Sequence, residues 1–411
     1  MSTTVSAPAG AERLHALDAV RAGALLLGVA FHAAMSFLPG PQLWMVRDVQ
    51  STELGVFFFT VHMFRMTLFF LIGGFFARML YQRRGLGGFV RDRAKRIALP
   101  LVVFWPIILP MIIAAFVFGY LAMHPEAATP GAPAAPPPPL TAQTFPLTHL
   151  WFLYVLCIFY AAALALRGLV VAIDRSGKLR ASVVDPVVRF VMKAQLTPLL
   201  AVPVGVALWL KSDWVMWFGV PTPDTGVIPN TAALLAFGAA FGFGWLLNRQ
   251  TDLLGVWEKS WMLNLGSAVI LTIVCLTLIG TTPIITPEAQ GWKKAAFLVS
   301  YLLGAWAWIA ALTGMALRFL SNRNPAIRYL ADASYWMYIA HLPIVMGMQL
   351  LVYRFAWPWE AKYALILWVS FATLLLSYHV MVRYTFIGAI LNGRKQQRRK
   401  KIPAPALAAA E

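Results

Sequence analysis

The stretch IALPLVVFWPIILPMIIAAFVFGYLA (residues 97–122) runs for 26 residues without a charged side chain. About 20 mostly apolar residues suffice for an α-helix to cross the hydrocarbon core of a bilayer. The sequence therefore predicts an all-α, polytopic membrane helix bundle of about ten transmembrane helices. The nine other stretches of this character are 17–38, 55–80, 149–173, 197–211, 231–247, 261–281, 295–318, 332–353 and 362–385.

The composition excludes the other broad classes of protein. Of the 411 residues, 60% are hydrophobic and 12% are charged, whereas soluble domains are about 45–50% apolar and about 25% charged. Too few polar residues remain to cover a soluble surface, and the chain is too apolar for disorder. Cys157 and Cys275 both lie within apolar stretches, which predicts small core side chains rather than redox chemistry.

The basic residues indicate how the chain lies in the membrane. Lys and Arg number 34 against 16 Asp and Glu, for a formal net charge of +18. In a membrane protein this excess is typical of positive-inside topology, so we predict membrane lipid and no nucleic acid as a partner. With the N-terminus inside, 24 of these 34 residues fall on the cytoplasmic side and six on the other. Ten spans then leave both termini cytoplasmic.

This topology divides the chain into three parts. Residues 1–16 form a cytoplasmic N-terminal segment and residues 17–385 the transmembrane domain. Within that domain residues 123–148 form an outer loop rich in proline. Residues 386–411 are expected to be a basic, disordered cytoplasmic tail.

Ionisable side chains within spans are costly, and they usually face a cavity or a partner. Asp18 and Arg21 are three residues apart and share a helix face, so we expect them to pair; the pair alone would only position the helix. His32 lies 14 residues beyond Asp18, about 21 Å along a helix, in the outer part of the first span. Asp18 therefore cannot orient His32.

The second span carries His62 at a depth similar to that of His32, and Arg65 one turn deeper on the same face. Arg65 has no acidic neighbour in sequence, so its partner either comes from another helix or is an anionic ligand. His62 is either part of this site or a packed structural residue. A histidine suits general base catalysis near neutral pH. Zinc binding is a weaker alternative, and we predict no metal.

Three further residues extend this group of candidates. His149 and Trp151 begin the fourth span at the outer surface, where they serve either the site or as interfacial anchors. His341 lies two residues before Pro343, which frees a backbone carbonyl in the helix. His341 therefore either does chemistry or satisfies such a carbonyl.

At the inner surface, Arg93 and Arg96 are three residues apart at the start of the third span. On one helix face they could bind phosphate or pyrophosphate, although charge alone favours ordinary positive-inside residues.

Five segments in chain order resemble the membrane acyltransferase type 3 family, and two lean toward its glucans biosynthesis protein C subgroup, the glucan succinyltransferases. Thr67 stands where many members have proline, and Gly73-Gly74 replaces the usual Ser-Gly. The segments are LDAVRAGALLLGVAFHA (Leu17–Ala33), FRMTLFFLIGGFFAR (Phe64–Arg78), RDRAKRIALPL (Arg91–Leu101), HLWFLYVL (His149–Leu156) and SYWMYIAHLPI (Ser334–Ile344).

The resemblance implies an O-acyltransferase of the bacterial inner membrane. It would move an acetyl or succinyl group from cytoplasmic acyl-CoA, its donor substrate, to a sugar hydroxyl of a periplasmic or envelope glycan, with no permanently bound cofactor. It implies His32 as the catalytic residue, to which we add His62 and Arg65, and Arg93 and Arg96 as contacts to CoA. The alternative is a transporter or flippase of a lipid-linked or small anionic substrate, which broken helices and intramembrane charge also allow.

Overall fold

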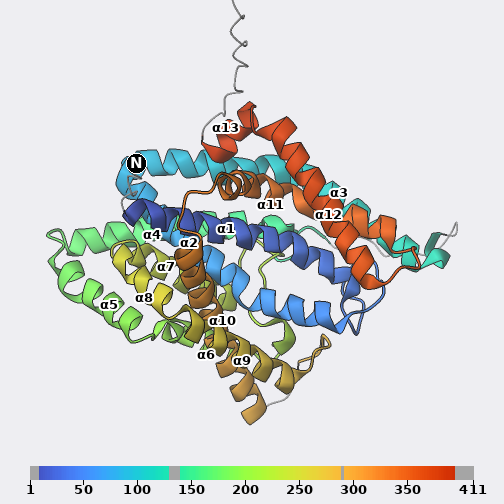
Figure 1. Cartoon of the computed structure of the whole chain (residues 1–411), viewed down its shortest axis with the longest axis horizontal. Helices are drawn as coiled ribbons and strands as arrows, with labels where there is room; N and C mark the ends of the chain where they lie inside the picture. Colours follow the sequence, from blue (N-terminus) through green and yellow to red (C-terminus); the bar gives the residue numbers. More distant parts are fainter. Residues whose placement is uncertain (1–8, 129–138, 288–290, 394–411) are drawn as a thin grey trace, which may run out of the picture.

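The computed structural model describes residues 9–128, 139–287 and 291–393 (Figure 1). These residues form helices and connecting loops, and none of them forms a β-strand, so the predicted all-α class is confirmed. The α-helices are α1 (Ala9–Ala34), α2 (Thr52–Arg93), α3 (Leu99–Met123), α4 (Trp151–Ile173), α5 (Asp185–Lys193), α6 (Val202–Leu210), α7 (Thr231–Leu247), α8 (Leu254–Lys259), α9 (Trp261–Ile279), α10 (Trp292–Phe319), α11 (Pro325–Val352), α12 (Trp359–Ser377) and α13 (Phe386–Asn392).

Among the described residues, seven helical segments are long and apolar enough to cross a membrane, or up to nine if two bent helix pairs each count as one span. One segment, Thr52–Met123, joins α2 to α3 through a π-helical turn and contains two of the spans expected from the sequence. Its 72 residues would measure about 108 Å as one helix, several times the bilayer core. Gly85, at φ 66°, breaks the helical backbone within it. The count of ten stays a prediction.

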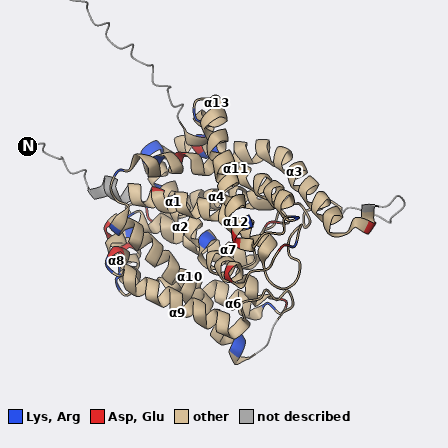
Figure 2. Cartoon of the chain, turned by 45° about the vertical axis from the view of Figure 1, so that its right-hand side comes forward, with Lys and Arg blue, Asp and Glu red and all other residues tan. Residues whose placement is uncertain are grey.

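The two short stretches rich in Gly and Pro form the bent pairs. Arg180–Lys193 turns into Thr197–Leu210 through 110°, and Thr231–Leu247 turns into Thr251–Lys259 through 112°. Long tan stretches of helix in Figure 2 carry no charged residue. With seven to nine such segments, the chain is a multi-pass membrane protein.

Helix α1 lies at the centre of the bundle, where it packs against α2, α10, α11 and α12. Figure 1 shows α1 and α2 running beside each other across the middle of the molecule. Helix α11 also packs against α3 and α12. As a result, residues of α1, α2 and α11 lie close together near the centre of the bundle.

Helices α2 and α7 approach each other closely through two glycines. A Cβ atom on Gly74 would overlap the backbone carbonyl of Phe241, and one on Gly244 would overlap the carbonyl of Leu71. Helices in a membrane gain little from the hydrophobic effect between them, so small residues that permit close backbone packing supply van der Waals contact instead. The Gly73-Gly74 pair in α2 is thus part of this helix contact.

The two ends of the bundle differ in their polar residues. At one end, here called the basic end, the start of α1, the end of α2 and the start of α11 meet, as His15, Arg83 and Asn322 line one cavity. At the opposite end, the loops around Pro146 and Thr225 join in an isolated β-bridge. The indole of Trp105 in α3 donates to the carbonyl of Pro146 at 2.8 Å.

The first residues of the predicted tail are helical. Phe386–Asn392 is the helix α13, with Thr385 capping its start by accepting from the Ile387 amide. Gly393, at φ 74°, ends it in the left-handed conformation that glycine adopts without strain. Leu391 is buried against the bundle. The rest of the expected tail (394–411) and most of the proline run (129–138) lie outside the described residues.

Candidate active site

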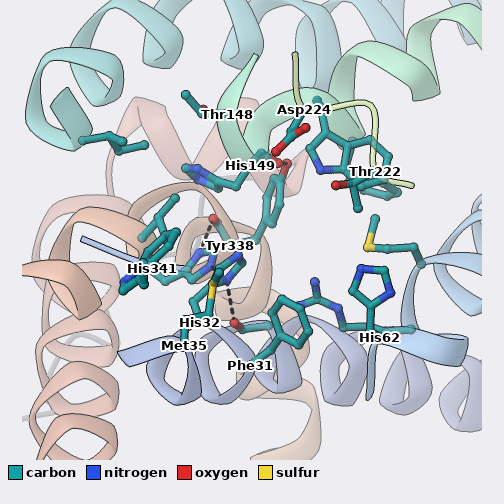
Figure 3. A pocket seen from close by; sticks show the side chains of 18 of the residues that line it. Phe31, His32, Met35, His62, Thr148, His149, Thr222, Asp224, Tyr338 and His341 are labelled. Atoms are coloured by element: carbon teal, nitrogen blue, oxygen red, sulfur yellow. Dashed lines mark hydrogen bonds between the residues drawn. The ribbon is translucent and has the colours of Figure 1, made fainter. Parts of the chain in front are cut away.

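A cavity of about 520 Å³ opens near the opposite end of the bundle, and four histidines line it: His32, His62, His149 and His341. We call it the histidine cavity (Figure 3). Helices α1, α2 and α11 and the turn before α4 each supply one of the four. Arg65 and Trp151 line it too. The chain thus brings every outer candidate from the sequence into one space.

His32 and His341 are hydrogen-bonded to each other, and their other contacts assign the protons. His341 Nδ1 lies 2.6 Å from the carbonyl of Tyr338, which only accepts, so Nδ1 carries the hydrogen. His341 Nε2 is then an acceptor in the neutral ring, and His32 Nδ1 lies 3.0 Å from it. His32 Nδ1 also lies 2.8 Å from the carbonyl of Gly28. The hydrogen of His32 is therefore on Nδ1, which leaves a lone pair on Nε2.

His149 satisfies the backbone carbonyl that Pro343 frees. Proline lacks an amide hydrogen, so residue 339, four positions earlier in α11, loses its helical hydrogen bond. His149 Nε2 lies 3.0 Å from the Ile339 carbonyl and donates to it. The hydroxyl of Tyr338 donates to the His149 carbonyl at 2.7 Å. One proline in α11 thus fixes a histidine that precedes α4.

Arg65 has no acidic partner among the described residues. Its buried Nε makes no hydrogen bond there, and its guanidinium lies 4.4 Å from the ring centre of Phe31, a cation–π contact. Gly28 gives the guanidinium room, because a Cβ on Gly28 would lie 2.7 Å from Arg65 Nη1. A partly buried guanidinium that lines a cavity and is paired with no carboxylate among the described residues suits an anionic oxygen of a ligand.

Two more buried polar atoms that line the histidine cavity lack a hydrogen bond within the described residues, His149 Nδ1 and Thr148 Oγ1. Thr148 has φ 54°, an uncommon conformation for a residue other than glycine. Asp224 and Thr222 line the same space, and Figure 3 places them on the side of Thr148. Unsatisfied buried polar groups are costly, and their gathering at one cavity favours a polar ligand there.

Gln349 fixes the end of α1 that carries His32. Its side chain is buried, and its amide donates to the carbonyls of His32 and Ala33 at 3.0 and 3.1 Å. Its oxygen accepts from the indole of Trp44 at 2.8 Å. Trp44 is a further lining residue of the histidine cavity. The side chain of Gln349 therefore positions both the backbone of His32 and the indole of Trp44, which forms part of the cavity wall.

A second cavity, of about 340 Å³, extends from the histidine cavity toward the basic end. We call it the basic cavity. Asp18, Arg21, Arg93 and Arg96 line it, which are the remaining candidates from the sequence. Asp18 and Arg21 form the expected ion pair at 3.1 Å. The two cavities share a wall of four side chains, namely Leu25, Phe69, Phe152 and Tyr338.

Arg93 and Arg96 both have partners on the protein. Arg93 binds Asp92 at 2.6 Å and the hydroxyl of Tyr160 at 3.3 Å. Arg96 donates to the carbonyl of Leu391 in α13 at 3.0 Å and lies 4.0 Å from Asp92. The pair thus tethers the helical turn after α2 to its surroundings while lining the basic cavity.

Sequence reasoning missed Tyr338, Gly28, Gln349 and Thr148. Tyr338 lies three residues before His341 on the same helix face, a spacing that marked it as a neighbour of the site. No residue pattern signals the others, because Gly28 leaves room for a side chain of another helix, Gln349 binds backbone carbonyls of another helix, and Thr148 places its hydroxyl through an uncommon backbone conformation. In the described parts of the chain, no group of three or more His, Cys, Asp or Glu residues is arranged to hold a metal ion.

The fold and these cavities define a multi-pass membrane protein with a histidine-lined site between its helices. Residues 14–382 match the model of the acyltransferase domain family, and the chain belongs to that family. It is an acyltransferase. No solved structure matches the chain.

Similar proteins support the same assignment. Glucans biosynthesis protein C of Escherichia coli O139:H28 (strain E24377A / ETEC) is 22% identical over 97% of this chain and 99% of its own length. The protein of the same name from Escherichia coli (strain SMS-3-5 / SECEC) is 33% identical over 153 residues, which span 37% of this chain and 38% of that relative.

Proposed function

We propose that this membrane acyltransferase moves an acetyl or succinyl group from acyl-CoA to a sugar hydroxyl of a glycan. The relatives named glucans biosynthesis protein C support a glucan or related envelope glycan as the acceptor. The observation that carries the proposal is the chain of hydrogen bonds from the Tyr338 carbonyl through His341 to His32. It leaves the lone pair of His32 Nε2 free to take a proton within the cavity.

His32 acts as the general base in this reaction. Its Nε2 takes the proton of the sugar hydroxyl as the sugar oxygen attacks the thioester carbonyl carbon. The resulting imidazolium keeps its Nδ1 hydrogen directed at two acceptors, the Gly28 carbonyl and His341 Nε2. When the carbon–sulfur bond breaks, the CoA sulfur takes the proton from His32, so the residue returns to its starting state. The products are an O-acyl sugar and free CoA thiol.

Arg65 stabilises the negative charge that develops on the thioester oxygen. Its partly buried guanidinium forms no ion pair within the described residues, so its positive charge is available to the ligand. A succinyl carboxylate is a second anion that this residue would accept. His62, four residues from Met66 on the cavity-facing side of α2, lines the same space and contributes a polar surface for the acceptor.

Donor and acceptor reach the site from opposite ends of the bundle. Arginines at the basic end complement the phosphates of CoA, and the thin pantetheine arm of CoA extends through the basic cavity to the wall that the two cavities share. The sugar enters from the end that carries Thr148 and Asp224. With the basic end in the cytoplasm, as the distribution of Lys and Arg predicts, the protein is a multi-pass protein of the bacterial inner membrane and the acceptor is periplasmic.

Release of free thiol tests this function directly. Purified protein with acetyl-CoA or succinyl-CoA should release CoA thiol when a glucan oligosaccharide is added, and mass spectrometry should detect the acylated sugar. His32→Ala should abolish both signals while the protein remains in the membrane. His379→Ala is the matched control, because His379 is exposed and lines neither cavity. Full activity of His32→Ala would overturn the assignment, and absence of thiol release from the wild type would favour the transporter alternative.

A further inference from the structure

A third cavity, of about 290 Å³, lies at the basic end beside the basic cavity. We call it the mouth cavity. The two cavities share Asp18, Arg21, Phe76, Met79, Arg83, Ala331 and Asp332 as lining residues. Since these shared residues come from α1, α2 and α11, the mouth cavity adjoins the basic cavity, which in turn adjoins the histidine cavity.

Three arginines of the mouth cavity have no ion pair or side-chain hydrogen bond within the described residues: Arg83, Arg323 and Arg328. They come from α2, from the link before α11 and from the first turn of α11. Arg93 and Arg96 differ, since each is already bonded to the protein. Among the arginines that line the two cavities at the basic end, the three that are free to take a ligand therefore line the mouth cavity.

The charge of this cavity favours an anion. Asp18 is paired with Arg21 at 3.1 Å, which leaves Asp332 as the other carboxylate in the lining. Three free guanidinium groups thus face one carboxylate. Asn324 caps the start of the 28-residue helix α11 and lines the cavity as well. The positive end of that helix dipole adds to the field of the arginines.

We propose that Arg83, Arg323 and Arg328 bind the phosphate groups of a nucleotide, and that this nucleotide is the CoA part of the acyl donor. A planar guanidinium binds phosphate oxygens with two parallel hydrogen bonds, and three of them match a ligand with several phosphates. The phosphates lie in the mouth cavity, and the pantetheine arm follows the basic cavity inward. The inference rests on the proposed function for the identity of the nucleotide.

Calorimetric binding to the purified protein tests the site without measuring turnover. Three probes are compared. They are CoA, its nucleotide fragment 3′-phosphoadenosine 5′-diphosphate, which keeps the phosphates, and pantetheine, which lacks them. The triple variant Arg83→Gln, Arg323→Gln, Arg328→Gln should bind CoA and the phosphate fragment at least about tenfold more weakly. Pantetheine binding should not change.

The matched control removes three charges of the same kind outside the cavities. Arg91, Arg175 and Arg318 are exposed and line none of the three cavities. Their triple glutamine variant should bind CoA as the wild type does. Equal loss in both triple variants would mean a general effect of net charge and would overturn the proposal.

Three further outcomes would contradict the proposal, and the first of them separates the two sources of phosphate. If the cavity variant binds CoA normally but loses bound anionic phospholipid, the arginines hold a lipid headgroup and the proposal is wrong. If the triple variant binds both CoA and phospholipid as the wild type does, the three arginines do not form the phosphate site, although the proposed function stands. A wild-type protein that binds no CoA would overturn both the site and the proposed donor.

Discussion

His341 Nε2 lies 3.0 Å from His32 Nδ1, although the two residues are 309 positions apart in the chain. The contact joins α1 to α11 and sets which nitrogen of His32 carries its hydrogen. Without it, only the Gly28 carbonyl, 2.8 Å from His32 Nδ1, would hold the hydrogen on that nitrogen and keep Nε2 free to accept a proton. The first prediction concerns this pair.

His341→Ala should lower kcat by about 100-fold or more, because His32 loses one of the two acceptors that hold its Nδ1 hydrogen and stabilise its charged form. The KM for the donor should change little, since His341 does not line the basic cavity. His341→Gln should keep more activity, because an amide oxygen can accept from His32 Nδ1. Thiol-release kinetics measure both constants. Equal activity of the alanine variant and the wild type would contradict the positioning role.

Gly28→Ala should reduce activity without reducing stability. Alanine in a helix interior is about 1 kcal/mol more favourable than glycine, so α1 should not suffer. The new methyl group would lie 2.7 Å from Arg65 Nη1 and would push the guanidinium from its place. We expect kcat to fall about tenfold or more. Gly23→Ala, on the same helix with open space around it, is the control. Thermal unfolding in detergent and thiol release report the two properties separately.

Pro343→Ala should strengthen α11 and weaken the site. An alanine restores an amide hydrogen that can bond the Ile339 carbonyl, which His149 now satisfies at 3.0 Å. His149 would then lose its fixed orientation, and we expect the acceptor KM to rise several-fold with an unfolding temperature equal to or above that of the wild type. A variant with unchanged kinetics would separate His149 from acceptor binding.

Gly74→Ala should destabilise the protein through the contact of α2 with α7, because its Cβ would overlap the Phe241 carbonyl. The backbone cannot yield as a flexible side chain can, so we expect a loss of about 2 kcal/mol or more, typical of overpacking. Gly242→Ala, two residues from the other contact glycine in α7, has nothing within 4 Å of its new methyl group and should be tolerated. Folded yield and thermal unfolding in detergent distinguish the two variants.

Residue type and spacing anticipated the membrane bundle and many of the ionisable residues that line its cavities, but not Asp224 or the three arginines of the mouth cavity. The described structure distributes those candidates between two adjoining cavities. Asp18 and Arg21 pair as their spacing predicts, since the i, i+3 contact is local to one helix. The tautomer of His32 was beyond such reasoning, because its partner His341 comes from a distant helix. The partner of the carbonyl freed by Pro343 was also left open, and it is His149, from a third segment.

By itself, the sequence determined that this chain is a helical, multi-pass membrane protein with a few polar groups held among apolar residues. Apolar length and the cost of burying charge decide those properties locally, so they can be read along the chain. Only the tertiary structure decided which histidines share hydrogen bonds, that Arg65 lacks an acidic partner among the described residues, and that Arg83, Arg323 and Arg328 line one mouth. These depend on contacts between α1, α2 and α11, and contacts between distant helices are set by packing in three dimensions.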